Sequence, residues 1–526
     1  MLKASFGFKG GITAPQKTAA LAGYDILKDG GTAIEAIVAA AATVAVTYPH
    51  MNSIGGDAFW LIKKEGTEPI AISGCGYSAA KASIGWYKER GFIDEIPTRG
   101  GLACLTVPGA VSSWERALSM VDSPMSIGDL LYNAISYAKN GFAVTANQSN
   151  CTVDKLNELK TISGFADTFL IDGLAPRPGF LLKQNALQNT LENLCHDGLS
   201  SFYRGDISQI HADYLSKNGS PLSVTDFNEF HAELVQPIKA EISKGDVYNL
   251  PAPTQGISSL MILSLFDKMR GLKLDSFDHL HSLIEITKYV FLKRNQELGD
   301  PDYMDSNVQS WLNGDVLGAL FSDIDLTTAM PWPYNPNKGD TIWMGAVDKK
   351  GTLVSFIQSV FWEFGSGLVC PDTGVFFQNR GAGFSLQEGP NRLNPKKKPL
   401  HTLNPALALL NDGRQMIYGT MGGDGQPQTQ STIFSRYAYF NCELQSAISE
   451  PRWLLGKTWG DMGTTLKMES RFDGRLIQKL KSIGHNVELL TKYSDLVGHA
   501  GAMVLNENGL IEGASDPRSD GSALSF

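Results

Sequence analysis

Two apolar runs joined by a short charged segment constrain the fold of this chain most strongly. Residues 341–347 carry Ile, Trp, Met and Val without a charge, and residues 352–362 are again apolar and rich in β-branched side chains. The segment 348–351 between them is typical of a turn, so the two runs predict a buried β-hairpin. With the turn centred in this segment, antiparallel pairing places Ser359 opposite Thr341 on one face, whereas a shift of one residue would separate them.

The segment before the first run is polar and rich in proline, which is typical of an exposed, cleavable linker over residues 330–339. By itself the hairpin is best explained as part of an ordinary core. A cut after the linker would leave Thr341 at a free N-terminus, where its α-amino group titrates near neutrality and is able to act as the base for its own hydroxyl. Thr341 is therefore a candidate nucleophile.

The composition indicates a soluble globular protein of 526 residues, with 43% hydrophobic and 19% charged residues. Its net charge of −9 argues against nucleic acid or an anionic membrane as a partner. No apolar run reaches membrane-spanning length, and the N-terminus lacks the apolar region of a signal peptide. The six cysteines are scattered, which predicts neither a zinc site nor a disulfide framework but reduced thiols in a cytoplasmic protein.

The rest of the chain alternates predicted helices and strands. We expect helices over residues 17–28, 33–47, 257–269 and 279–296, a mostly helical chain from 126 to about 230, strands over 58–63, 71–77 and 416–420, and a last hairpin over 501–514. Thr32 is the expected N-cap of the second helix. No nucleotide-binding or metalloprotease motif occurs, so we expect neither a metal nor an organic cofactor.

A glycine turn follows the predicted strand 416–420. The turn, Met421-Gly-Gly-Asp-Gly425, leads into a helical stretch from about residue 428. A strand, a glycine turn and a helix start together present backbone N–H groups and the helix dipole to an anion. In acyl transfer such a turn forms an oxyanion hole. The alternative is a plain connection between a strand and a helix.

Several short segments, unspecific one by one, resemble the γ-glutamyltransferase family in their order and spacing. They are Gly30-Gly31, Gly55-Gly56, Val107–Gly109, Pro251–Gly256, Asp340-Thr341, Phe364–Gly367, Lys398–Leu400 with Asn404-Pro405, Gly422-Gly423 and Gly513–Arg518. The similarity extends from about residue 10 to the end of the chain. Members of this family are N-terminal nucleophile hydrolases, so the resemblance implies an α+β fold, the four-layer αββα sandwich, made as a self-cleaving proenzyme.

The resemblance also implies the roles of particular residues. Autocatalytic cleavage at Asp340–Thr341 would divide the chain into a large subunit, 1–340, and a small subunit, 341–526, within one intertwined unit. These subunits would form a heterodimer or a dimer of such heterodimers. Thr341 is implied as the nucleophile, Gly422 and Gly423 as the oxyanion-hole pair, and Ser359 as a hydroxyl near the nucleophile, which the hairpin pairing selects independently.

The segments that hold a glutamyl group in the family differ in this chain. The usual Thr-Thr-His is Thr341-Ile-Trp343, and the arginine of the family's Ala-Thr-Arg segment is absent from Ala82-Ser-Ile84. The segment that binds the glutamyl amine corresponds to Gln378–Phe384, which has no acid and carries Arg380. The family's Ser-Ser pair corresponds to His401-Thr402.

These differences predict a substrate with a carboxylate and no ammonium group. A cationic Arg380 attracts a carboxylate and repels an amine, although a structural ion pair is the alternative role for this residue. We expect Arg380, His401 and Thr402 to bind substrate. Asp424 joins them because it lies in the pattern Gly422–Pro427, which is similar to the oxamate amidohydrolase branch of the family.

The resulting hypothesis is an amidohydrolase that releases ammonia from a small carboxylate-bearing amide such as oxamate, through an acyl-enzyme. Each lost charged contact typically costs about 2–5 kcal/mol, so γ-glutamyl compounds should be poor substrates. One alternative is a γ-glutamyltransferase, a glutathione hydrolase or a glutaryl-type acylase. Another is an unprocessed relative that only binds a small ligand.

Overall fold

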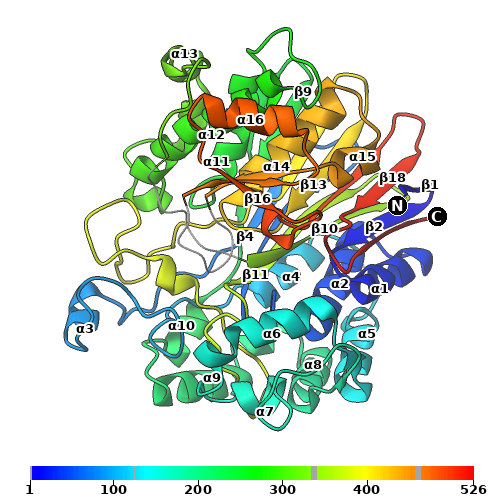
Figure 1. Cartoon of the computed structure of the whole chain (residues 1–526). Helices are drawn as coiled ribbons and strands as arrows, with labels where there is room; N and C mark the ends of the chain where they lie inside the picture. Colours follow the sequence, from blue (N-terminus) through cyan, green and yellow to red (C-terminus); the bar gives the residue numbers. More distant parts are fainter. Residues whose placement is uncertain (1–2, 123–124, 333–339, 457–463) are drawn as a thin grey trace.

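Two seven-stranded antiparallel sheets stack face to face at the centre of the computed structural model, with helices on their outer faces (Figure 1). The structure describes residues 3–122, 125–332, 340–456 and 464–526, so residues 333–339 of the predicted linker lie outside the described chain. The first sheet has the order β1 (Ser5–Gly7), β18 (Ile511–Ser515), β17 (Ala500–Leu505), β13 (Gln415–Thr420), β12 (Ala406–Leu410), β9 (Gly245–Asn249) and β8 (Ile238–Ile242). The second has the order β19 (Ser522–Ser525), β2 (Gly10–Ala14), β10 (Asp340–Asp348), β11 (Leu353–Phe361), β3 (Asp57–Lys63), β4 (Ile70–Gly74) and β7 (Glu233–Val235).

Helices cover both outer faces, and further helices extend the layer on the second sheet. On the second sheet lie α1 (Lys17–Lys28), α2 (Ala33–Thr47) and α4 (Ala110–Leu118), and α5 (Ile127–Asn140) packs on α2. Beyond them follow α3 (Ile84–Lys88), α6 (Ala146–Leu159), α7 (Phe165–Phe169), α8 (Asn185–Asp197), α9 (Asp206–Lys217), α10 (Val224–Glu229) and the short strands β5 (Phe142–Ala143) and β6 (Leu181–Leu182). On the first sheet lie α11 (Gly256–Phe266), α14 (Gly425–Phe434) and α15 (Leu444–Ser449), while α12 (Phe277–Glu297) and α13 (Gly314–Asp323) pack on α11. Of the helices described, none is both long and apolar enough to cross a bilayer.

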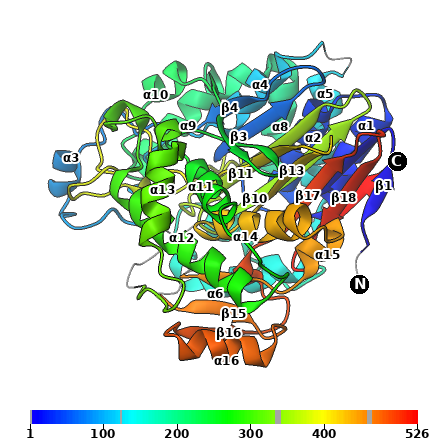
Figure 2. The same cartoon turned by 90° about the horizontal axis from the view of Figure 1, so that it is seen from above.

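A third, smaller sheet lies outside the first-sheet helices (Figure 2). It consists of β14 (Trp453–Leu455), β15 (Leu466–Glu469) and β16 (Val487–Leu490), and α16 (Gly474–Ser482) covers it. The two chain ends lie close together at one edge of the main sheets (Figure 1), where the carbonyl of Phe526 accepts the N–H groups of Phe8 and Lys9.

Three apolar layers hold this arrangement together. One fills the space between the sheets and contains Phe59, Trp343 and Ile417. The second lies between the second sheet and its helices, and the third between the first sheet and its helices. Helix, sheet, sheet and helix therefore follow one another, which confirms the predicted αββα sandwich.

Strands from before and after residue 340 are interleaved in both main sheets. In the second sheet, β10 and β11 lie between β2 and β3. In the first sheet, β18, β17, β13 and β12 lie between β1 and β9. A cut at residue 340 would leave two chains that share both sheets. The division into subunits itself stays a prediction.

The predicted helices 17–28 and 33–47 are confirmed at both ends as α1 and α2. Thr32 caps α2 as expected, in a capping box with Glu35, and every residue of this alanine-rich helix is buried. The predicted strand 71–77 ends earlier, at Gly74, because the following residues turn to contact the loop at Val107. The helix expected from about residue 428 begins at Gly425, because the glycine turn itself forms its first hydrogen bonds.

Candidate active site

Packing between the two sheets fixes the position of Thr341. A side chain at Gly345 would meet Ile417 of the facing sheet, and one at Gly419 would overlap the Trp343 indole. Residues 345 and 343 of β10 therefore lie over residues 417 and 419 of β13. Continuing this correspondence by two residues places Thr341 over the turn that begins at Met421.

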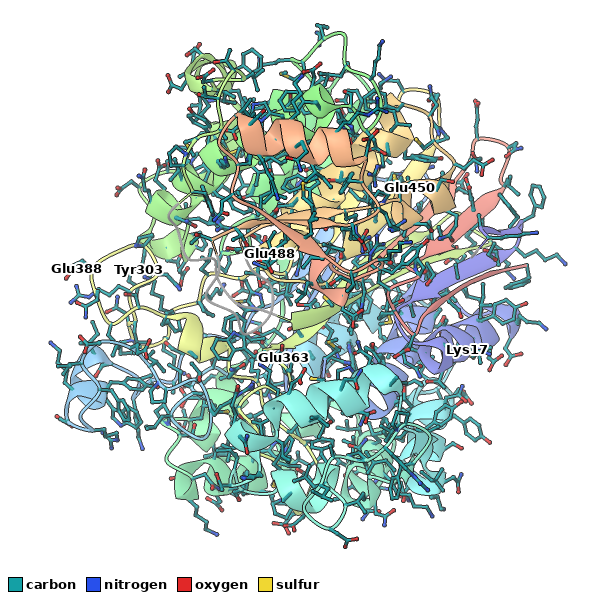
Figure 3. All side chains as sticks on the ribbon, viewed as in Figure 1. Lys17, Tyr303, Glu363, Glu388, Glu450 and Glu488 are labelled. Atoms are coloured by element: carbon teal, nitrogen blue, oxygen red, sulfur yellow. The ribbon has the colours of Figure 1, made fainter. Side chains whose placement is uncertain are left out.

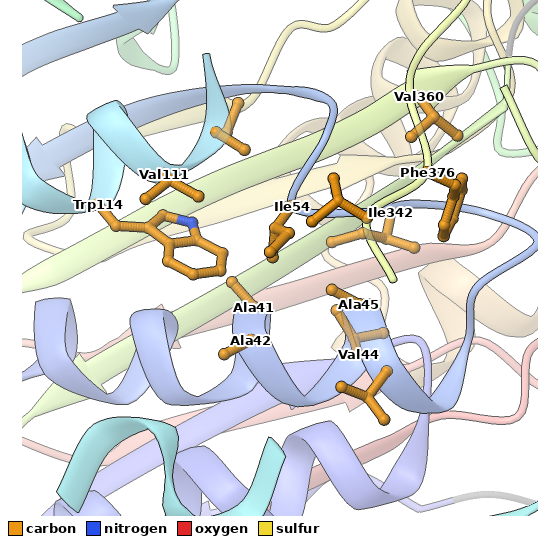
Figure 4. Packing of buried hydrophobic residues seen from close by; sticks show 14 of the residues in the cluster. Ala41, Ala42, Val44, Ala45, Ile54, Val111, Trp114, Ile342, Val360 and Phe376 are labelled. Carbon is orange, nitrogen blue, oxygen red and sulfur yellow. The ribbon is translucent and has the colours of Figure 1, made fainter. Parts of the chain in front are cut away.

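Side chains of β10 alternate between the two faces of the second sheet. Ile342 faces α2 and lies among Ala45, Ile54 and Val360 (Figure 4). Trp343 points the other way, into the layer between the sheets, where its indole N–H donates to Ser355 at 3.0 Å. This alternation puts position 341 on the inter-sheet side, and Thr341 is 1% exposed.

The predicted pairing of Thr341 with Ser359 is interrupted in the structure. The ladder is regular up to the pair Ile342–Gln358, but the next pair joins Asp340 to Phe361, so the register shifts at Thr341. The cause lies in β11, where Phe361 adopts a φ of 82° and its N–H donates to the Ser359 hydroxyl at 2.8 Å. Ser359 stays buried close to the start of β10, and its role beside the nucleophile stays a prediction.

The loop that follows β11 is held from the α6 side. Arg99 donates to the carbonyls of Glu363 and Gly365, and Lys155 of α6 lies 3.6 Å from the Glu363 carboxylate. Glu363 accordingly lies between the end of β11 and α6 (Figure 3). The Asn379 side chain closes the loop, since its oxygen accepts the N–H of Trp362 at 3.1 Å. One wall of the site is thereby fixed.

The glycine turn after β13 presents two unused N–H groups. Gly422 and Gly423 are buried and have φ values of 115° and 51°, a left-handed conformation that favours glycine. Within the described chain, neither N–H has a hydrogen-bond acceptor. A buried N–H without an acceptor costs roughly 1–3 kcal/mol, and an oxygen placed at this turn would remove that cost. It lies where the sheet packing places Thr341.

Arg380 lies near the start of β10, and within the described chain no carboxylate is in ion-pair contact with it. Its guanidinium stacks over the Phe361 ring, 3.8 Å from the centroid, and Phe361 is paired with Asp340. Arg380 is 1% exposed, and of the described residues only Thr402 accepts a hydrogen bond from it, at 3.3 Å. No described carboxylate lies within 4.0 Å, and burial lowers the pKa of Arg380 to about 10. A buried cation in this state favours an anionic ligand.

Thr402 and Gln255 connect Arg380 to the glycine turn. The Gln255 side-chain amide donates both to the Thr402 carbonyl and to the Gly423 carbonyl, each at 2.8 Å. The contacts therefore run from Arg380 through Thr402 and Gln255 to Gly423. The structure thus connects Arg380, Thr402 and the glycine pair by hydrogen bonds, and the sheet packing directs the start of β10, with Thr341, toward the same turn.

The His401 side chain pairs with Asp57, which lies opposite Ser359 in the ladder of β3 and β11. Its Nε2 lies 2.9 Å from Oδ2 of Asp57, and its ring packs edge-on against Phe59. The other Asp57 oxygen accepts from Gln378 and from the N–H groups of Gly76 and Gly109. Burial raises the pKa of Asp57 to about 7 and holds the pKa of His401 well below its usual range, so the imidazole is neutral. Substrate binding by His401 stays a prediction.

Asp424 forms an ion pair that the sequence did not reveal. Its carboxylate oxygens accept from the two terminal nitrogens of Arg294 at 2.9 and 3.1 Å, and both residues are almost fully buried. Asp57, Gln255 and Arg294 are the residues that sequence reasoning missed. Gln255 lies inside the segment Pro251–Gly256 of the resemblance and Asp57 directly follows Gly55-Gly56, which was the available signal. Arg294 lies in a helix and gave no signal.

Two groups of described side chains have metal-ligand composition, namely Asp57, Cys75 and His401, and His281, Glu285 and His485. The positive charge of Arg380 acts on both Asp57 and Cys75 in the first group. In the second group, the Lys288 ammonium lies 2.7 Å from the Glu285 carboxylate. The positively charged side chain beside each group disfavours a metal ion there. We therefore assign no metal site to either group.

The sequence is similar to known proteins of one family over almost its whole length. A sequence model of the gamma-glutamyltranspeptidase family matches residues 19–526. The oxamate amidohydrolase proenzyme of Klebsiella pneumoniae is 46% identical over 98% of this chain and 98% of its own length. The glutathione hydrolase-like YwrD proenzyme of Bacillus subtilis is 38% identical over 100% of both chains. The predicted family is confirmed.

Solved structures support the same fold. The cephalosporin acylase from Bacillus halodurans superposes with a TM-score of 0.92 and 29% identity, covering 100% of this chain and 97% of that one. A likeness of this extent includes both main sheets and their helices.

The pH dependence of the free energy of unfolding should reveal the raised pKa of the buried Asp57 carboxyl. Its pKa is about 7 in the folded chain and about 4 when unfolded, so between these values the folded chain holds a proton that the unfolded chain releases. The free energy of unfolding should therefore fall as pH rises through this window, by up to about 1.4 kcal/mol per pH unit. Asp57→Asn should remove this contribution, as measured by urea unfolding at about pH 5 and about pH 7. Asp372→Asn, at an exposed site, is the control, and an unchanged pH slope in Asp57→Asn would contradict the assignment.

Proposed function

Because the chain belongs to the gamma-glutamyltranspeptidase family, we propose that it is an N-terminal threonine amidohydrolase that releases ammonia from a small carboxylate-bearing amide such as oxamate. The observation that carries the proposal is Arg380, a buried guanidinium beside the start of β10 with no described carboxylate within 4.0 Å. The similarity to a protein named oxamate amidohydrolase proenzyme supports the same substrate class.

Cleavage before Thr341 generates the catalytic groups. The relatives named as proenzymes support this step. In it, the Thr341 hydroxyl attacks the carbonyl of Asp340, the peptide becomes an ester, and water hydrolyses that ester. Thr341 is left with a free α-amino group, which is a base near neutral pH.

Acylation uses Arg380 and Thr402 to hold the substrate and the glycine pair to bind its amide oxygen. The substrate carboxylate binds the Arg380 guanidinium and the Thr402 hydroxyl, while the amide carbonyl oxygen accepts from the N–H groups of Gly422 and Gly423. The Thr341 oxygen attacks the carbonyl carbon and its proton passes to the α-amine, which then protonates the leaving nitrogen. The two glycine N–H groups stabilise the negative charge that develops on the oxygen.

Deacylation reverses these roles with water as the nucleophile. The α-amine takes a proton from water, the hydroxide attacks the ester carbonyl, and the Thr341 oxygen leaves with a proton. Oxamate and one water molecule thus yield oxalate and an ammonium ion, with the water oxygen in the new carboxylate. Every step uses groups of the chain and water.

The charge around the site favours this substrate over a γ-glutamyl amide. A γ-glutamyl group carries an ammonium beside its α-carboxylate, and the segment Gln378–Phe384 offers no acid to receive it. The nearby acid, Asp57, already accepts from Gln378 and two backbone N–H groups. An ammonium placed near Arg380 would meet like charge and lose its hydration without a partner.

A substrate panel tests the proposal directly. The purified, processed protein should release ammonia from oxamate and show a much lower kcat/KM with γ-glutamyl-p-nitroanilide, because one substrate satisfies Arg380 and the other opposes it. Ammonia and p-nitroaniline are measured separately under the same conditions. A clear preference for the γ-glutamyl compound would overturn the assignment in favour of a glutathione hydrolase or transferase.

Arg380→Gln isolates the contribution of the guanidinium. Loss of a buried charged contact costs about 2–5 kcal/mol, so kcat/KM for oxamate should fall by about 30-fold or more. Arg392→Gln is the control, since Arg392 is an arginine of the neighbouring loop that pairs with exposed Glu388. Equal loss in both variants, or none in Arg380→Gln, would argue that Arg380 has a structural role only.

Thr341→Ala tests the nucleophile and the cleavage together. Without the hydroxyl the chain should stay whole and inactive, whereas the wild-type protein should give two bands of unequal size on a denaturing gel. N-terminal sequencing of the smaller band should begin at Thr341. An intact wild-type chain that still releases ammonia would refute this mechanism.

A further inference from the structure

Every N–H of the Arg294 guanidinium has an acceptor. A guanidinium has five N–H groups. Three go to side chains on the active-site side, namely Oδ1 and Oδ2 of Asp424 at 2.9 and 3.1 Å and Oε1 of Gln255 at 2.7 Å. The other two converge on Oδ1 of Asn295 at 3.0 and 2.8 Å. The guanidinium also stacks 4.0 Å from the Phe291 ring, so its position is fully determined.

Gln255 is equally saturated. Its Oε1 accepts from Arg294, and its two amide hydrogens go to the carbonyls of Thr402 and Gly423. Arg294 therefore fixes which way the Gln255 amide is turned, because only one orientation presents oxygen to the guanidinium and nitrogen to both carbonyls. All three side chains, of Gln255, Arg294 and Asp424, are 1–2% exposed.

These contacts hold the peptide plane that directly follows the two planes of the glycine N–H groups. A peptide carbonyl and the next residue's N–H share one rigid plane. The Met421 carbonyl accepts from the Thr420 hydroxyl at 2.9 Å, and the Gly422 carbonyl accepts from the Gly425 N–H at 2.8 Å, which orients the N–H groups of Gly422 and Gly423. Gln255 and Arg294 hold the next two positions, through the Gly423 carbonyl and the Asp424 side chain.

The turn needs this support because it consists of glycines. Two consecutive glycines with positive φ have more conformational freedom than any other pair, and their buried N–H groups have no acceptor among the described residues. Outside a ligand-bound state, the turn is therefore held mainly through its carbonyls and through Asp424. Gln255 directly precedes α11, Asp424 directly precedes α14 and Arg294 lies in the last turn of α12, so the network also joins three helices.

We propose that Gln255, Arg294 and Asp424 are positioning residues that orient the N–H groups of Gly422 and Gly423 toward the oxyanion. This inference rests on the oxyanion role of the glycine pair in the proposed function. It assigns Asp424 to the turn and Arg294, rather than to the substrate, because both carboxylate oxygens are already taken by Arg294. The substrate carboxylate is left to Arg380.

Asp424→Asn and Gln255→Met test the proposal with side chains of nearly unchanged size. A misplacement of the donors by about 1 Å lowers the rate about 100-fold, and it acts in the transition state more than in the ground state. In both variants kcat for oxamate should therefore fall about 10- to 100-fold, while KM stays within about twofold of the wild-type value. A raised KM at unchanged kcat in Asp424→Asn would overturn the proposal and return Asp424 to substrate binding.

Asp275→Asn is the matched control for a purely structural effect. Asp275 pairs with Arg436, another fully buried arginine, at 2.9 and 3.0 Å, but neither residue contacts the glycine turn through any hydrogen bond of the described chain. Thermal unfolding should show a loss of stability in both variants, smaller for Asp275→Asn because Asp275 is 28% exposed and Asp424 is 1% exposed, with kcat reduced only in Asp424→Asn. An equal loss of kcat in the two would overturn the proposal.

Binding of methylboronic acid separates this inference from the choice of substrate. The Thr341 oxygen adds to boron, its proton passes to the α-amine, and the resulting tetrahedral anion presents an oxygen to the glycine pair. Calorimetry should show binding to the wild-type protein and about 10-fold weaker binding to Asp424→Asn and Gln255→Met. Equal affinity in all three, or no binding to any, would overturn the inference. Weakened boronate binding in a protein that does not hydrolyse oxamate would instead refute the proposed substrate alone.

Discussion

The packing of Trp343 between the two main sheets determines where the site forms. Its indole fills space that glycines at 345, 419 and 501 leave open, and a side chain at 419 or 501 would enter that space. Because the indole also donates to Ser355, its orientation is fixed from within its own hairpin. The sheets can therefore approach only in the register that lays the start of β10 over the end of β13. Core packing alone therefore directs the start of β10 toward the glycine turn that follows β13, before any polar contact is considered.

The polar contacts around the site follow a division between satisfied and unsatisfied groups. All N–H groups of the Arg294 guanidinium and of the Gln255 amide donate hydrogen bonds, and the Gln255 side-chain oxygen accepts one. Both side chains support the glycine turn. Arg380 is buried with a single hydrogen bond, to Thr402, and the N–H groups of the two glycines have no acceptor among the described residues. A preorganised site requires residues with complete hydrogen bonding that support groups still able to bond a ligand. Only the ligand then completes the hydrogen bonding.

Local signals in the sequence predicted those parts of the fold that local interactions decide. The helix after Thr32 was predictable at both ends because its capping box and its alanine composition are properties of neighbouring residues. The hairpin of β10 and β11 was predictable for the same reason, but the register shift at Thr341 was not, because it depends on the φ of Phe361. Arg380 was identified only through a difference from related sequences. Arg294 and Asp424, separated by 130 residues in the chain, meet only in the folded state and could not be paired in advance.

Because the strands are interleaved, the parts of the chain before and after residue 340 are held together more firmly than two separate domains that share only a surface. Should the backbone open at residue 340, neither fragment could leave without breaking hydrogen-bonded ladders on both of its sides, in two sheets at once. Fragments made apart would each lack the neighbours of their central or flanking strands, and would expose long unpaired edges that invite aggregation. Synthesis as one polypeptide avoids this problem, because both sheets are complete before the chain is cut. The two fragments then remain associated through the hydrogen bonds of the sheets.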